Sequence, residues 1–197
     1  MLGHLIRKQR KSASKHFCVV QLNARLQPIH RGEFFEDELD EALKKSRYGV
    51  VSGGGTFRAQ NGEIEHCDIE IELSGDSSAA VQLIITTLDA LGTPKGSKLH
   101  LNHEGRNIPF GKSEGLAIYL NGTDLADEVY KTCDSNFVYS EFDRLLQGEG
   151  RVLSYWQGPI ETAFYIYGNS YGMMHHRLTE FLTSYPLCQK CRVVKIA

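Results

Sequence analysis

The chain has 197 residues, of which 41% are hydrophobic, and its formal net charge is -2. This length and composition suit one large globular domain or two small ones. No apolar stretch approaches the roughly 18 residues of a membrane span, and the N-terminus lacks the hydrophobic region of a secretory signal. The five cysteines form an odd and scattered set, which indicates reduced thiols. We therefore expect a cytoplasmic protein with no membrane association.

The charge is distributed unevenly along the chain. Segment 1–16 holds five bases and no acid, so 17 of the 22 bases face all 24 acids in the rest of the chain. Such a basic arm is either a solvated or self-docking segment or a contact for an anionic partner. The acidic remainder argues against nucleic acid as the partner, because it would repel phosphates.

The first half of the chain predicts elements in the order βαββαβ. Apolar residues at alternate positions or at helical spacing define each element, and turn residues separate them. The expected strands are 17–26, a strand through the glycines 53–55, 64–73 and 97–102, and the expected helices are 33–46 and a helix from about 77 with Asp76 as its N-cap.

Three consecutive glycines, Gly53 to Gly55, raise the question of a phosphate-binding loop. The next residue is Thr56, so the lysine of a Walker motif is missing, and no helix follows as a dinucleotide motif requires. Asn61-Gly62 instead indicates a hairpin. We interpret the glycines as a crease or bulge in the first strand of this hairpin, and we expect no cofactor.

The second half repeats the plan of the first. Strands are expected at 115–120, 152–156, 162–167 and 191–196, with one helix capped by Asp134 and another capped by Ser170. Equivalent features recur about 92 to 99 positions apart, which is typical of a duplicated unit. The predicted fold class is α+β, with two tandem ferredoxin-like units, each a four-stranded antiparallel sheet with two helices on one face. The expected divisions are a basic arm at 1–16, a first unit at 17–102, a connector at 103–114 and a second unit at 115–197.

Alternation along the second unit's strands predicts an aromatic surface. If the helices cover Leu116, Ile118, Leu120, Phe164 and Ile166, then Tyr119, Tyr165 and Tyr167 point to the other face of the sheet. Either Tyr155 or Trp156 joins them, depending on the strand register. Such a patch is typical of an interaction site for a protein partner or a second copy, or of a face that the two units bury against each other.

Two of these strands also resemble the aromatic strands of RNA-recognition modules. The segments are Leu116-Ala-Ile-Tyr-Leu-Asn-Gly122 and Ala163-Phe-Tyr-Ile-Tyr-Gly168. The resemblance implies bases stacked on outward rings. Glu161 and Thr162 stand where the module has a basic opening.

The sequence favours a non-catalytic binding protein, of the inhibitor or immunity type or self-associating, over an enzyme. No nucleophile elbow is present, and Cys188-Gln-Lys-Cys191 supplies only half of a zinc site, so no metal is expected. The expected binding residues are Tyr119, Tyr155, Trp156, Glu161, Tyr165 and Tyr167. The alternative is an enzyme or sensor that binds a small molecule in the cleft between the units, with Glu161 and either His175 or His176 in that cleft.

Overall fold

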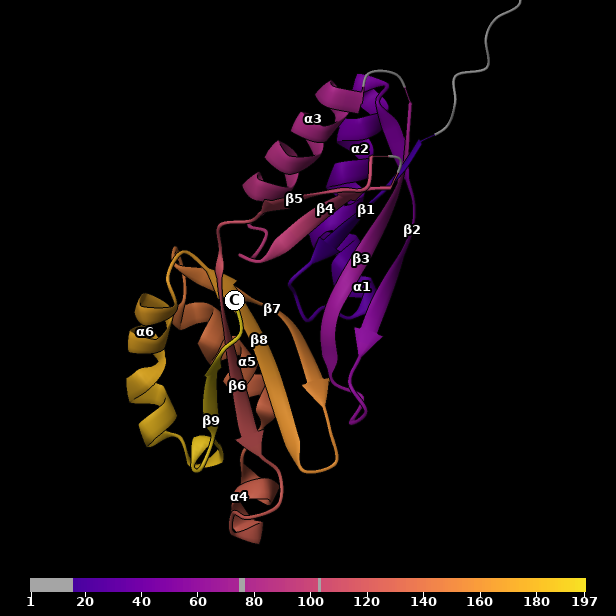
Figure 1. Ribbon diagram of the computed structural model, residues 1–197. Helices are drawn as coiled ribbons and strands as arrows, with labels where there is room; N and C mark the ends of the chain where they lie inside the picture. Colours follow the sequence, from indigo (N-terminus) through magenta and orange to yellow (C-terminus); the bar gives the residue numbers. More distant parts are fainter. Residues whose placement is uncertain (1–15, 75–76, 103) are drawn as a thin grey trace, which may run out of the picture.

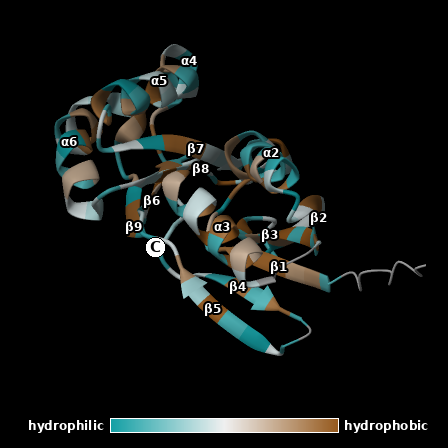
Figure 2. Cartoon of the chain, turned by 90° about the horizontal axis from the view of Figure 1, so that it is seen from above, coloured by the Kyte–Doolittle hydropathy of each residue, from teal (hydrophilic) through white to brown (hydrophobic). Residues whose placement is uncertain are grey.

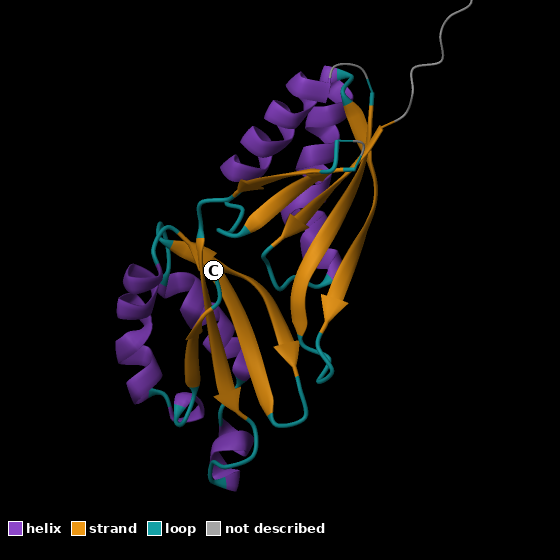
Figure 3. Ribbon diagram, viewed as in Figure 1, coloured by secondary structure: helices purple, strands orange, loops and turns teal. Residues whose placement is uncertain are grey.

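A computed structural model describes residues 16–74, 77–102 and 104–197. These residues form two antiparallel sheets with strand orders β2-β3-β1-β4-β5 and β7-β8-β6-β9 (Figure 1). The tandem ferredoxin-like prediction is confirmed, and the helices of each unit lie on one side of its own sheet (Figure 3). None of the helices in this described part is long and apolar enough to cross a membrane.

The first unit contains five strands and its helices in the predicted order, with one strand added at the end. Its elements are β1 (His16–Leu22), α1 (Pro28–Arg31), the π-helix η1 (Gly32–Glu36), α2 (Asp37–Ser46), β2 (Gly49–Arg58), β3 (Ile64–Leu73), α3 (Ser77–Ala90), β4 (Ser97–Leu101) and β5 (Arg106–Phe110). Phe35, Leu39 and Leu43 are fully buried, as their fourfold spacing predicts. The proposed N-cap Asp76 lies outside the described residues.

The second unit follows the same plan. Its elements are β6 (Glu114–Asn121), α4 (Asp127–Thr132), α5 (Ser135–Leu145), β7 (Gly150–Gln157), β8 (Glu161–Gly168), α6 (Tyr171–Ser184), η2 (Pro186–Cys188) and β9 (Arg192–Lys195). Both predicted caps are confirmed, because Asp134 accepts the amide N–H of Asn136 and Ser170 accepts that of Met173. The short helix α4 was not predicted.

The three glycines lie inside β2 and are part of a sheet, as the sequence predicts. The register of β2 against β3 shifts between Val51 and Gly53. A Cβ on Gly54 would lie 2.6 Å from Glu36 Oε1 and 2.7 Å from the carbonyl oxygen of Asp68. Arg31, almost fully buried, pairs there with Glu36 at 2.6 Å. Glycine is therefore needed because an ion pair occupies the space that a side chain would fill.

The segment expected to be a connector, 103–114, contains the strand β5, so the first sheet has five strands and not the predicted four. β5 pairs with β4 in antiparallel register from Ser97 and Phe110 to Leu101 and Arg106. Figure 2 shows β5 as largely hydrophilic, and it contains Pro109, so it gives little strand signal. A polar strand with a proline is tolerated at a sheet edge, where one side needs no ladder partner.

Burial distinguishes the two sheets. In β6 and β8, runs of consecutive residues are buried, whereas in β1 and β3 burial roughly alternates. Leu116, Ile118 and Phe164 cluster with the second unit's helices. Tyr119 and Tyr165 belong instead to the cluster that contains the first unit's core. Both faces of the second sheet are therefore covered, one of them by the first unit.

Candidate functional site

The three interface tyrosines, Tyr119, Tyr165 and Tyr167, lie on the sheet face opposite the helices, as alternation predicts. They are only 4%, 0% and 3% exposed. The chain that follows β1 lies against them: the Arg25 amide N–H donates to the Tyr167 hydroxyl at 2.8 Å, and the Arg25 guanidinium donates to Tyr119 at 2.6 Å. The expected open surface is thus buried inside the chain. This is the alternative in which the two units bury this face against each other.

A charged cluster lies at the centre of this junction. Glu63, from the β2–β3 hairpin, accepts hydrogen bonds through Oε1 from Tyr119 at 2.5 Å and from Tyr165 at 2.9 Å, and it forms an ion pair with Arg25. Burial, and then the bond to Glu63, raises the pKa of Tyr119 to about 12. Burial also raises the pKa of Tyr165 and of Tyr167. The cluster satisfies polar groups that the contact removes from water, so it fixes how the units meet.

The register of β7 decides between Tyr155 and Trp156. A shift between Val152 and Ser154 places Trp156 opposite Ala163 and Tyr155 opposite Phe164. Trp156 therefore joins the junction face, where it is partly buried against the first unit's cluster, and Tyr155 points to the other side with 42% of its surface exposed. The Trp156 ring folds back over the hairpin turn, since a Cβ on Gly158 would lie only 2.1 Å from it.

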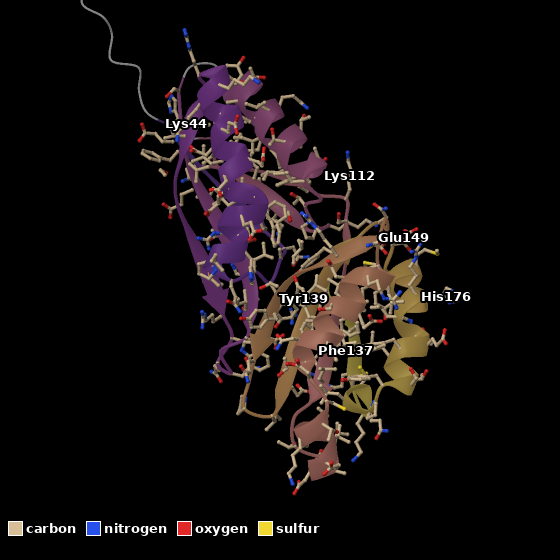
Figure 4. All side chains as sticks on the ribbon, turned by 180° about the vertical axis from the view of Figure 1, so that it is seen from behind. Lys44, Lys112, Phe137, Tyr139, Glu149 and His176 are labelled. Atoms are coloured by element: carbon tan, nitrogen blue, oxygen red, sulfur yellow. The ribbon has the colours of Figure 1, made fainter. Side chains whose placement is uncertain are left out.

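A cavity of about 510 Å³ lies beside the edge strand β7, between the two units. Figure 4 places Tyr139 on α5 where that helix faces the first unit. The first unit supplies residues from α1 and η1, and the second unit supplies residues from α5, β7 and β8. The lining of the cavity includes His30, Glu33, Phe34, Asn136, Tyr139, Ser154, Tyr155 and Phe164.

The floor of this cavity carries a hydrogen-bonded pair from the two units. His30 Nδ1 lies 2.9 Å from Ser154 Oγ, which also accepts the Gln27 amide N–H at 3.2 Å. Burial lowers the pKa of His30, although the nearby Glu33 carboxylate opposes this effect, so the imidazole is neutral near pH 7. Since the serine engages Nδ1, Nε2 is the ring nitrogen left for a ligand.

Rings surround this polar floor. The His30 ring centroid lies 6.0 Å from that of Tyr155 and 6.2 Å from that of Phe34. Burial raises the pKa of Tyr139, and the carboxylates of Asp143 and Glu33 add to the effect. The cavity thus combines aromatic walls with a carboxylate, an imidazole and hydroxyl groups.

The other predicted site residues do not meet in a cleft. Glu161 forms a two-bond pair with Arg192, at 2.8 Å for each bond. Arg192 in turn lies over the Tyr119 ring, at 4.1 Å from its centroid, so this pair is on the junction side of the sheet. His175 lines a separate cavity beside α6, and Figure 4 places His176 on the outer side of α6. The sheet therefore separates Glu161 from both histidines.

The cysteine pair lies beside η2, away from the junction. Burial raises the pKa of Cys188 to about 12, and it also raises that of Cys191, which makes both thiols poor nucleophiles at neutral pH. In the part of the chain that the structure describes, no three histidine, cysteine or acidic side chains are grouped to hold a metal ion.

Sequence reasoning missed most of the cavity, with Tyr155 as the exception. His30 and Glu33 come from a region where the sequence predicts no more than the start of a helix, and Ser154 lies in a strand without any motif. The Pro28 that begins α1 was the one available signal that the chain turns at this point. Their assembly depends on how the units dock, which no local pattern encodes.

Comparisons with known proteins found no matching family model and no curated relative. Solved structures with similar arrangements include the first two RRM domains of a yeast poly(U)-binding protein, with 9% identity over 91% of this chain and 99% of that chain and a TM-score of 0.24. The regulatory subunit of aspartate kinase from Thermus thermophilus has 10% identity over 84% and 92%, with a TM-score of 0.27. A putative monooxygenase from Fusobacterium nucleatum has 8% identity over 93% and 92%, with a TM-score of 0.31. Similarities this weak carry no argument about function.

Proposed function

We propose that this chain is a binding protein, and more specifically a sensor that holds a small organic molecule in the cavity between its two units. The observation that carries the proposal is the cavity itself, because its volume of about 510 Å³ falls within the range of ligand pockets and its walls come from both units. We propose the cavity as the binding site in place of the expected protein-binding surface, because the first unit already covers the interface tyrosines.

The lining favours a planar ligand with a basic or hydrogen-donating nitrogen. Phe34, Tyr139 and Tyr155 offer ring faces and edges on which a flat molecule stacks, and a cation gains further from such rings. Glu33 is a hydrogen-bond acceptor only, so it selects a donor. A flat carboxylate of the same size would meet repulsion from Glu33.

A ligand in this position can act on the relation between the units. It would contact α1 and η1 of the first unit together with α5 and β7 of the second, so its binding energy favours the arrangement in which all four are close. Trp156, the only tryptophan of the chain, does not line the cavity but lies at the junction that such a ligand would stabilise. Its fluorescence is therefore expected to report a change in how the two units meet.

The experiment compares a panel of aromatic amines with carboxylates of matched shape, using ligand-observed NMR for every chain and Trp156 fluorescence for the native chain alone, because each variant adds a second tryptophan. Ser135→Trp introduces a bulky ring into the cavity lining from an exposed helical position. Ser140→Trp makes the same change on the same helix and is exposed but is not among the lining residues. We expect amines to bind the native chain and the Ser140 variant but not the Ser135 variant. If both variants bind equally, or if carboxylates bind as well as amines, the proposed site or its selectivity is wrong.

A further inference from the structure

The open face of the first sheet differs from that of the second, because nothing among the described residues covers it. Phe17 and Phe57 lie on this face and are 47% and 55% exposed. Phe57 stacks on His66 with a centroid distance of 4.4 Å. The interface tyrosines on the equivalent face of the second sheet are buried by the first unit. Phe17 and Phe57 remain on the surface, and exposed aromatic rings are a feature of interaction sites.

A row of acids runs along β3 on the same face. Ile69 belongs to the core, so its neighbours Asp68 and Glu70 point to the open side. Glu70 is exposed, and Asp68 Oδ1 is buried without a hydrogen-bond partner in the described chain. A buried carboxylate oxygen without a donor is costly, so this atom calls for a cation or another donor that the described residues do not supply.

The glycines of β2 leave this acidic row accessible. Gly54 faces the core side, where the Arg31–Glu36 pair lies, so Gly53 and Gly55 face the open side next to Glu70 and Asp68. A strip of bare backbone therefore runs beside the two carboxylates. A Cβ on Gly53 would lie 3.2 Å from Glu70 Oε2, so an extended segment that approaches this strip meets backbone and the acids themselves, with no other side chain of β2 between them.

The N-terminal segment 1–15 has the chemistry that this face requires. It carries five bases, Arg7, Lys8, Arg10, Lys11 and Lys15, together with the apolar residues Leu2, Leu5 and Ile6. The segment joins β1 at His16, which pairs with Leu73 at the end of the acidic strand β3. Fifteen residues reach up to about 50 Å when extended, so the segment is long enough to turn back across the sheet.

We propose that residues 1–15 dock on the open face of the first sheet. The lysines and arginines pair with Asp68 and Glu70, a basic group supplies the missing donor to Asp68 Oδ1, and the apolar residues cover Phe57 and Phe17. Because the segment is attached to the same chain, its local concentration is high and weak individual contacts suffice. Exposed charge pairs are screened by salt, so docking weakens as ionic strength rises. This inference is independent of the ligand cavity, which lies between the two units and not on the open face of the first sheet.

Carbodiimide crosslinking of the full chain tests the proposal, since this reagent joins a lysine to a carboxylate only when the two are in contact. Peptide mass spectrometry is expected to find Lys8, Lys11 or Lys15 linked to Asp68 and Glu70 at low salt, with the yield falling at high salt. A mixture of isotopically heavy and light chains separates links within one chain from links between two.

The matched variants are Glu70→Lys and Glu41→Lys, which make the same charge change at exposed positions on β3 and α2. Glu70→Lys is expected to reduce the links from the segment to Asp68 by about fivefold or more, because it turns attraction into repulsion, while Glu41→Lys leaves them unchanged. Links spread over the acids of α2 and α5, links mainly between chains, or equal effects of the two variants would each overturn the proposal.

Discussion

Removing a single hydroxyl at the junction is expected to destabilise the whole chain. The Tyr165 side chain is fully buried, and its hydroxyl donates to Glu63 Oε1 at 2.9 Å. Tyr165→Phe keeps the ring, so the packing of the two units is preserved and only the hydrogen bond is lost. The change therefore isolates the contribution of one polar contact to the contact between the units.

The magnitude follows from the nature of the acceptor. A hydrogen bond to a charged group is worth about 1.5 to 3 kcal/mol net. Glu63 keeps its contacts with Arg25 and Tyr119, so no carboxylate is left without partners and the lower part of this range applies. We expect the free energy of unfolding to fall by about 1.5 to 2 kcal/mol.

Urea unfolding followed by Trp156 fluorescence and by circular dichroism measures this loss. Tyr171→Phe is the control, because the Tyr171 ring lies on α6 beside His175, away from the first unit. Removing the Tyr171 hydroxyl should change the free energy of unfolding by less than about 0.5 kcal/mol. If Tyr165→Phe also costs less than about 0.5 kcal/mol, the hydroxyl does not meet a desolvated carboxylate and the described junction is wrong.

Three further outcomes are expected. Gly54→Ala should lower the free energy of unfolding by roughly 1 to 3 kcal/mol, because its Cβ meets the carbonyl of Asp68, whereas Gly55→Ala, with 4.0 Å of space, should be tolerated; equal urea midpoints would contradict this. The raised pKa values of the interface tyrosines stabilise the fold fully below pH 10, and this contribution is lost as the pH rises above 10. For Tyr119, with a pKa of about 12, the loss extends from pH 10 to about 12 at up to about 1.4 kcal/mol per pH unit. A pH series in which Tyr165→Phe does not reduce the loss above pH 10 would count against this. Gly158→Ala should displace the Trp156 ring and shift its emission, and an unchanged spectrum would show that the ring does not cover the turn.

Local patterns predicted the two halves of the chain well, for identifiable reasons. Strand alternation placed the interface tyrosines opposite the helices because one residue in two must face the helix layer. Asp134 and Ser170 were recognised as caps because their side chains replace the missing partners of helix amides. β5 was not predicted because a polar edge strand with Pro109 has little apolar signal. The bulge in β7 left the sequence unable to decide whether Tyr155 or Trp156 faces the junction.

The site was less accessible to sequence reasoning than the fold. The sequence left open whether the tyrosines form a free surface, because nothing local distinguishes a face that meets a separate protein from one that meets the other half of the same chain. Glu63 and Arg25, which decide the matter, gave no functional signal, because Arg25 was expected inside the strand 17–26 whereas β1 ends at Leu22, and Glu63 lies between the hairpin turn and β3. His30 and Ser154 are 124 positions apart, so their meeting depends on a docking geometry that only the structure defines.

An isotope-filtered NOE experiment on an equal mixture of labelled and unlabelled chains is the most direct test of whether one chain covers its own aromatic face. The Arg25 guanidinium carbon lies 5.6 Å from the centre of the Tyr165 ring, so NOEs between the Arg25 side chain and the rings of Tyr165 and Tyr119 are expected. We predict that these NOEs arise within single chains only. If they are absent, or if they appear between labelled and unlabelled chains, the two units do not close on each other as described.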